Sequence, residues 1–134
     1  MLAGQAQKEG FVNEIAARLD ALVFIAVEAE SNTPPANAIE GQSWLVGIAP
    51  GGTWAGYAGK IASFQSGNWI FTQPILGMRI YNKSLGQEVL FRNGWNAAAR
   101  PPVPSGGTTI DSESRAAIAA IIGALVAAGI VPAT

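Results

Sequence analysis

The residues of this chain that could carry chemistry are few, and their types exclude most enzyme classes. Among 134 residues there is no histidine and no cysteine, which excludes a Ser–His–Asp triad, thiol catalysis and the usual zinc sites. A glycosidase needs two facing carboxylates, but the middle of the chain offers only Glu40 and Glu88, each beside turn residues. The Gly pairs at 51–52 and 106–107 lack the Lys-Ser/Thr of a phosphate-binding loop. We therefore predict no enzymatic activity, no cofactor and no metal.

Aromatic side chains are the remaining candidates for recognition. All four tryptophans lie between residues 44 and 95. Two similar stretches, FQSGNW and FRNGW, place Phe and Trp on either side of a Gly turn, and we interpret Trp69 and Trp95 as packing elements of two hairpins. Trp54 and Tyr57 differ because they lie in the Gly-rich stretch APGGTWAGYAG. Exposed there, their rings would stack on a sugar, so these two are the candidate ligand-binding residues.

These side chains are positioned by a β-rich middle segment between two helices. From residue 42 to 96, short apolar runs alternate with turn signals at Ser66-Gly67, residues 84–86 and Asn93-Gly94, which indicates an antiparallel meander. Pro-rich linkers at 31–41 and 99–108 separate it from the flanking helices. The predicted fold class is α+β, with an N-terminal helix, a β meander and a C-terminal helix. The predicted parts are an oligomerisation helix (1–31), a β-rich domain (32–100), and a linker with the C-terminal helix (101–134).

The N-terminal helix, predicted over residues 5–29, carries apolar residues at alternating spacings of three and four. Such a seam is buried either against the sheet of the same chain or against copies of itself. Only 13% of the residues are charged. Either much of the surface consists of Gly, Ser, Thr, Asn and Gln, or part of it is buried by partner subunits. The candidate interface residues on this helix are Val12, Ile15, Leu19 and Leu22.

The C-terminal helix begins after the N-cap candidates Thr109 and Asp111 and is expected to end at Gly129. Its uncharged run, 116–133, is mostly alanine, which favours packing against protein over membrane insertion. No basic run is present, which argues against nucleic-acid binding. The candidate interface residues on this helix are Ile118, Ile121, Ile122 and Leu125.

Three stretches carry a family resemblance: AGQAQKEGFVNEIAARLDAL, TWAGYAGKIASFQSGNW and EVLFRNGW. Over residues 3–95 the chain resembles a phage-structural domain of unknown function found in prophage tail and fibre proteins and in gene-transfer-agent particles. The resemblance implies a non-catalytic component of the virion surface, in a tail fibre, spike or baseplate. It implies a homo-oligomer, most simply a trimer, that contacts other virion proteins. The alternative is a carbohydrate-binding module that recognises a host surface polysaccharide.

Overall fold

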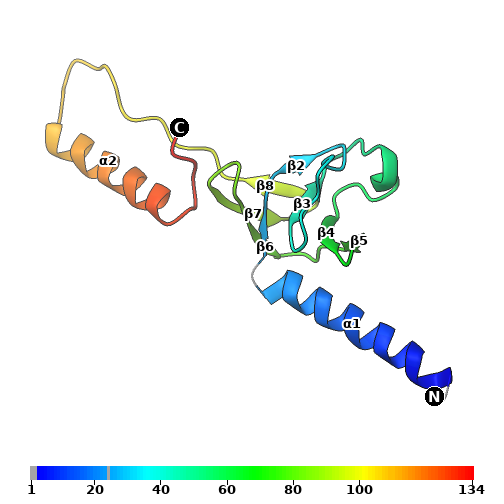
Figure 1. The fold of residues 1–134 in the computed structure, drawn as a ribbon. Helices are drawn as coiled ribbons and strands as arrows, with labels where there is room; N and C mark the ends of the chain where they lie inside the picture. Colours follow the sequence, from blue (N-terminus) through cyan, green and yellow to red (C-terminus); the bar gives the residue numbers. More distant parts are fainter. Residues whose placement is uncertain (1–2, 24) are drawn as a thin grey trace.

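The structure is a computed structural model that describes the backbone of residues 3–23 and 25–134, and the side chains of 8–20, 23 and 25–134. Helices α1 (Ala3–Val23) and α2 (Ser112–Ala127) flank eight short strands, as Figure 1 shows. This confirms the predicted α+β class. The strands are β1 (Ala26–Val27), β2 (Glu30–Ser31), β3 (Ser43–Val46), β4 (Ile61–Gln65), β5 (Asn68–Thr72), β6 (Arg79–Asn82), β7 (Gln87–Phe91) and β8 (Trp95–Ala97).

The strands form two four-stranded sheets, in the orders β1-β6-β7-β8 and β2-β3-β4-β5. Within them, β3-β4-β5 and β6-β7-β8 are antiparallel meanders, as expected from the turn signals. The structure adds two parallel pairs, because β1 pairs with β6 and β2 pairs with β3. Both sheets are therefore mixed.

The segment of residues 25–31 joins the two sheets. The Lys83 amide donates to the Val27 carbonyl at 2.9 Å, and the Glu28 amide donates to the Ser43 carbonyl at 2.8 Å. The prediction of a helix up to residue 29 is wrong, since α1 ends at Val23. The physical reason is burial, because the Val27 side chain is fully enclosed between the sheets. The backbone of this segment forms hydrogen bonds with β3 on one side and with the end of β6 on the other.

The core lies between the sheets and takes one residue from each of five strands. Its buried members are Val27, Leu45, Ile61, Ile80 and Val89. Each buried aliphatic side chain contributes about 1.5–3 kcal/mol by leaving water. The sheets are further tied by the Trp95 indole, whose Nε1 donates to the Gly59 carbonyl at 2.9 Å.

Two hairpin turns follow the sequence signals closely. Ser66 and Asn93 both have positive φ angles, 52° and 48°, and each is followed by a glycine that also has positive φ. Ser66 and Gly67 form a two-residue hairpin loop, which requires such a left-handed pair, because Gln65 pairs with Asn68. The second loop has three residues, 92–94, because Phe91 pairs with Trp95. The Glu40 carboxylate accepts hydrogen bonds from the first turn's amides, at Ser66 and Gly67. The predicted turns are therefore confirmed, and one of them is capped by a distant side chain.

Helix α2 is capped at both ends. Asp111 is the N-cap, and its carboxylate accepts from the Ser114 amide at 2.9 Å. At the other end Gly129 has a φ of 68°, with Gly129 N–H donating to Val126 and Ile130 N–H donating to Leu125. This is the Schellman pattern, which satisfies two carbonyls at the end of the helix. Both predicted ends of this helix are confirmed to within two residues.

The Asp111 cap makes the start of α2 sensitive to acid. Hydrogen bonds from the Ser114 amide, then from the Ser114 hydroxyl, lower the pKa of Asp111. The stabilisation is therefore present above the unfolded pKa of about 3.9 and is lost as the pH falls through the lower folded value. The protection factors of the amides in the first turn of α2, which divide the intrinsic exchange rate at each pH by the observed rate, should fall over that interval. Asp111→Asn, which still caps but does not titrate, should show a smaller fall.

Candidate functional site

An aromatic cluster covers the outer face of the β2-β3-β4-β5 sheet. The 3₁₀ turn Gly52–Trp54 folds the Gly-rich loop back onto this face, and Trp54 is 0% exposed. Its ring meets Trp69 edge-on at 5.0 Å between centroids. The expectation that Trp54 stands out from the loop is wrong, because glycines let the loop turn tightly enough to bury the ring against Ala62 and Val46.

Tyr57 is also engaged within the chain. Its ring stacks on Phe71 with centroids 3.6 Å apart and planes 6° from parallel. The Lys60 ammonium lies 5.2 Å from the same ring centroid. One ring face is thus covered by Phe71, so Trp54 and Tyr57 do not form a paired platform for a sugar.

The two repeated stretches form cross-strand aromatic pairs. Phe64 and Trp69 are directly opposite in β4 and β5, with centroids 5.0 Å apart. Phe91 and Trp95 are opposite in β7 and β8, at 5.1 Å. Such pairs stabilise antiparallel strands, so the interpretation of FQSGNW and FRNGW as hairpin packing is confirmed.

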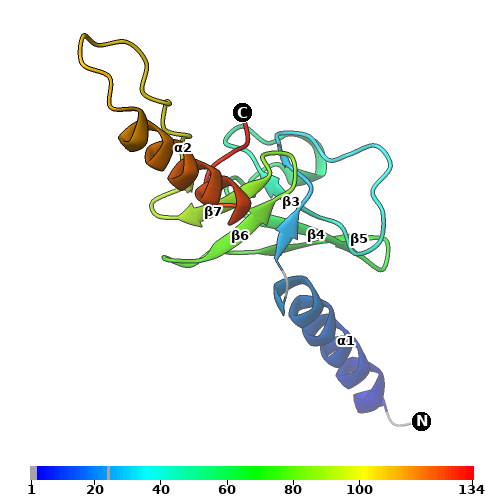
Figure 2. The ribbon, with the colours of Figure 1, turned by 90° about the vertical axis from the view of Figure 1, so that its left-hand side faces the viewer.

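Helix α1 extends away from the sheets, as Figures 1 and 2 show. Three predicted interface residues, Val12, Ile15 and Leu19, are exposed, and so are Phe11 and Val23 on either side of them. All five side chains are between 57% and 76% exposed. We call these five residues the α1 seam. All five stay exposed, although Val23 lines a cavity together with Ile80 and Tyr81 of β6. The side chain of Leu22 lies outside the described residues.

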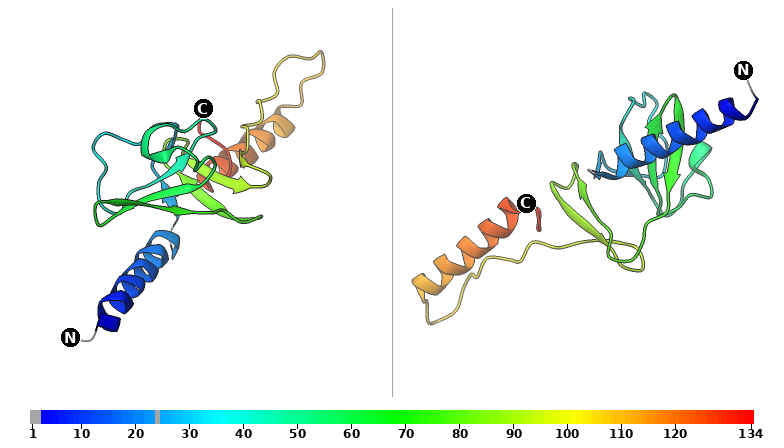
Figure 3. Two further views of the ribbon diagram at one scale, coloured as in Figure 1. Left: turned by 90° about the vertical axis from the view of Figure 1, so that its right-hand side faces the viewer. Right: turned by 90° about the horizontal axis from the view of Figure 1, so that it is seen from below.

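The opposite side of α1 is the one that faces the β-sheets. Asn13, Glu14 and Ala17 line a shallow cavity of about 230 Å³ together with the β4–β5 hairpin. At 100° per residue, these positions lie across the helix from Ile15 and Leu19. The left view of Figure 3 shows that α1 runs away from the sheets toward the N-terminus. Among residues 8–20 only Ala17 is partly buried, so the polar side lies nearer the hairpin while both sides of the helix are largely exposed.

The candidate interface residues of α2 separate into two groups. Ile118 and Ile121 are exposed, and Leu125 is partly buried. Ile122 is 3% exposed, so its side chain already packs inside its own chain and is not available as an interface. The prediction for Ile122 is therefore corrected.

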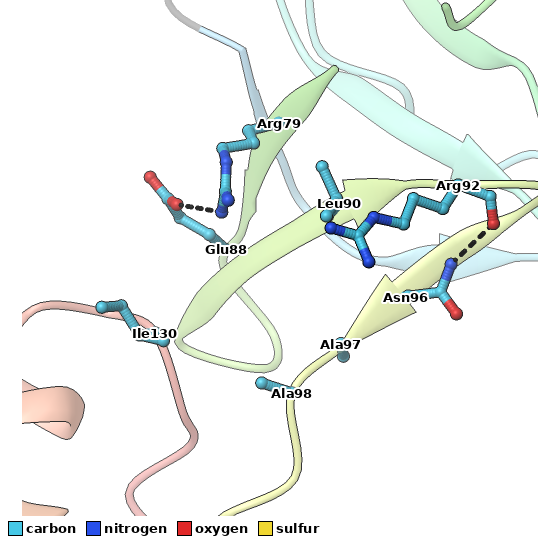
Figure 4. A pocket seen from close by; sticks show the side chains of 8 residues that line it. All are labelled: Arg79, Glu88, Leu90, Arg92, Asn96, Ala97, Ala98 and Ile130. Atoms are coloured by element: carbon cyan, nitrogen blue, oxygen red, sulfur yellow. Dashed lines mark hydrogen bonds and ion pairs between the residues drawn. The ribbon is translucent and has the colours of Figure 1, made fainter. Parts of the chain in front are cut away.

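A groove of about 490 Å³ lies on the outer face of the other sheet, where the segment after α2 approaches β6, β7 and β8 (Figure 4). Strand register brings Arg79, Leu90 and Asn96 into one row, because Arg79 pairs with Leu90 and Leu90 with Asn96. The Arg79 guanidinium contacts the Glu88 carboxylate at 3.4 Å. The lining residues are Arg79, Glu88, Leu90, Arg92, Asn96, Ala97, Ala98 and Ile130.

The sequence does not indicate this groove. Arg79 lies in β6 and Arg92 directly follows β7, so only the pairing of β6 with β7 brings them to one face. The residue types of β6 give no clear signal either, because the exposed Tyr81 is aromatic and the buried Asn82 is polar.

The described part of the chain offers neither a metal site nor a membrane span. No group of three or more acidic, His or Cys side chains is placed to hold a metal ion within it. Among the helices that the structure describes, none is long and apolar enough to cross a membrane.

A family model with the description "Protein of unknown function (DUF2793)" matches residues 12–96. The chain belongs to this family. The DUF2793 match begins at Val12 in the α1 seam and ends at Asn96 in β8, so it includes both sheets and most of the seam, and α2 lies outside it. No curated protein matches the chain.

Proposed function

We propose that this DUF2793 protein is a non-enzymatic structural component of a phage or phage-like particle that self-associates through α1. The observation that carries the proposal is the exposure of the α1 seam. Five large apolar side chains of one helix are each more than half exposed in the single chain. Exposed apolar surface of this kind is stabilised by burial, and copies of the same helix supply a matching surface.

The a and d positions of α1 do not by themselves choose the number of copies. Val12 and Leu19 are a positions, and Ile15 and Leu22 are d positions. Leucine at a with isoleucine at d favours trimers or tetramers, whereas valine at a with leucine at d favours dimers. Phe11 and Val23 occupy the flanking g and e positions, which usually carry charges in two-stranded coils, so the apolar stripe suits a larger number of helices.

The placement in a virion surface, such as a tail fibre, spike or baseplate, rests on the resemblance of the AGQAQKE, TWAGYAGKIASFQSGNW and EVLFRNGW stretches to phage-structural proteins. Other virion proteins are then its partners. The sugar-binding alternative is not proposed further, because Trp54 is buried and Tyr57 stacks on Phe71.

Light scattering on the purified chain tests self-association. We expect a mass of three times the 13.8 kDa chain at micromolar concentration. A mass of one chain at all accessible concentrations would refute self-association. Mass spectrometry of purified particles tests the location separately, and absence of the chain from them would refute only the virion assignment.

A further inference from the structure

We propose that the groove on the outer face of β6, β7 and β8 binds the terminal carboxylate of a peptide chain whose last residue is aliphatic. The groove combines cationic side chains with an aliphatic lining, and both features are needed for this choice of occupant. It lies on a different sheet from the aromatic cluster. Arg79 and Glu88 of the groove also line a neighbouring cavity with Val23, the last residue of the α1 seam.

Arg79 and Arg92 are the side chains that would bind the carboxylate. The Arg92 guanidinium makes no ion pair or hydrogen bond with any described residue, and Arg79 has only its single 3.4 Å contact with Glu88. Figure 4 shows the Arg92 side chain running back along the strands, so that the two guanidinium groups flank Leu90. Two neighbouring positive charges beside one carboxylate leave a net positive charge in the groove. A guanidinium binds a carboxylate through two parallel hydrogen bonds, which makes a carboxylate the fitting anion.

The other residues that line the groove favour an aliphatic group next to that carboxylate. Leu90, Ala97, Ala98 and Ile130 are aliphatic, and no aromatic ring lines the groove. A sugar acid gains most of its contact from flat aromatic partners, so this lining suits a branched aliphatic side chain better. The volume of about 490 Å³ lies in the range of small-ligand pockets and admits a terminal residue with its peptide group.

Asn96 acts as a positioning residue. Its Nδ2 donates to the Arg92 carbonyl at 3.0 Å and to the Gly94 carbonyl at 2.8 Å. These bonds fix the turn from which the Arg92 side chain starts. A guanidinium on a fixed backbone loses less freedom on binding, which raises affinity.

The experiment titrates isotope-labelled full-length protein with N-acetyl-leucine and records backbone amide and arginine Nε signals. N-acetyl-leucine carries the carboxylate, peptide group and aliphatic side chain of a chain terminus. N-acetyl-leucinamide is the matched control, since it keeps the shape but replaces the charged carboxylate with a neutral amide. We expect shifts at Leu90, Arg92 and Asn96 with the acid, and at least about tenfold weaker binding of the amide, as expected for loss of a charged hydrogen-bond pair.

Variants assign the binding to the groove. Arg92→Gln should weaken N-acetyl-leucine binding about tenfold or more, whereas Arg18→Gln, on α1, should leave it unchanged. Glu88→Gln should strengthen binding severalfold, because it frees Arg79 and removes a competing carboxylate. A merely structural role for these side chains would not produce gains and losses of opposite sign.

Three results would overturn the proposal. The first is equal binding of the acid and the amide, and the second is no binding of either. The third is binding of glucuronate at least as tight as that of N-acetyl-leucine, which would identify an acidic-sugar site instead. None of these results bears on the α1 seam, so this proposal and the proposed function fail separately.

Discussion

Trp54→Ala is expected to destabilise the protein by about 3–5 kcal/mol, the cost of truncating a large buried aromatic side chain. The ring is fully enclosed, contacts Trp69 edge-on, and anchors the Gly-rich loop to the sheet. Its loss opens a cavity between the loop and the outer face of the sheet. The measurement is the urea unfolding midpoint, which should fall well below that of the wild-type protein.

Trp54→Phe is the matched control. The Trp54 Nε1–H is buried without an acceptor among the described residues, so phenylalanine removes an unsatisfied donor while keeping most of the apolar ring. It should therefore cost clearly less than Trp54→Ala. An unchanged midpoint for Trp54→Ala would show that the loop contributes no packing and that its ring leaves the sheet in solution.

Ile15→Asp or Leu19→Asp is expected to convert the oligomer into single chains. Each copy would place an unpaired carboxylate in the centre of the helix interface, at a cost of several kcal/mol per subunit. The β-sheets should stay folded, because both side chains are exposed in the single chain. Light scattering measures the mass, and circular dichroism verifies the fold.

Asn13→Asp is the matched control for these variants. It adds the same charge two residues away, on the side of α1 that faces the β4–β5 hairpin. We expect it to keep the oligomeric mass. If Ile15→Asp and Leu19→Asp also keep that mass, self-association through the α1 seam is refuted.

The local turn chemistry could be predicted because it depends on adjacent residues. Ser66-Gly67 and Asn93-Gly94 combine residue types that favour left-handed backbone in turns, and Asp111 caps a helix through its own side chain. The α1 seam was equally visible, since its spacing of three and four lies along one short stretch.

Features that depend on distant partners could not be predicted. Residues 25–31 continue an apolar helical pattern, and only the strands β3 and β6 on either side make an extended segment more stable there. Trp54 lies in a stretch that is typical of a surface loop, and its burial depends on the sheet face that the loop covers. The groove needs the register of β6 and β7 to bring Arg79 and Arg92 together.

The parallel pairing of residues 26–31 also sets an order of folding events. Ala26 pairs with Tyr81, so β1 can pair only after β6 has formed. Each hairpin, in contrast, needs only a loop of a few residues to close. Closing short loops is faster than closing long ones, so the two meanders should form first and the N-terminal segment should dock last. Because α1 precedes that segment in the chain, a copy would present its seam beside a completed domain only after its β-sheets have formed. Incomplete chains would then be at a kinetic disadvantage in assembly.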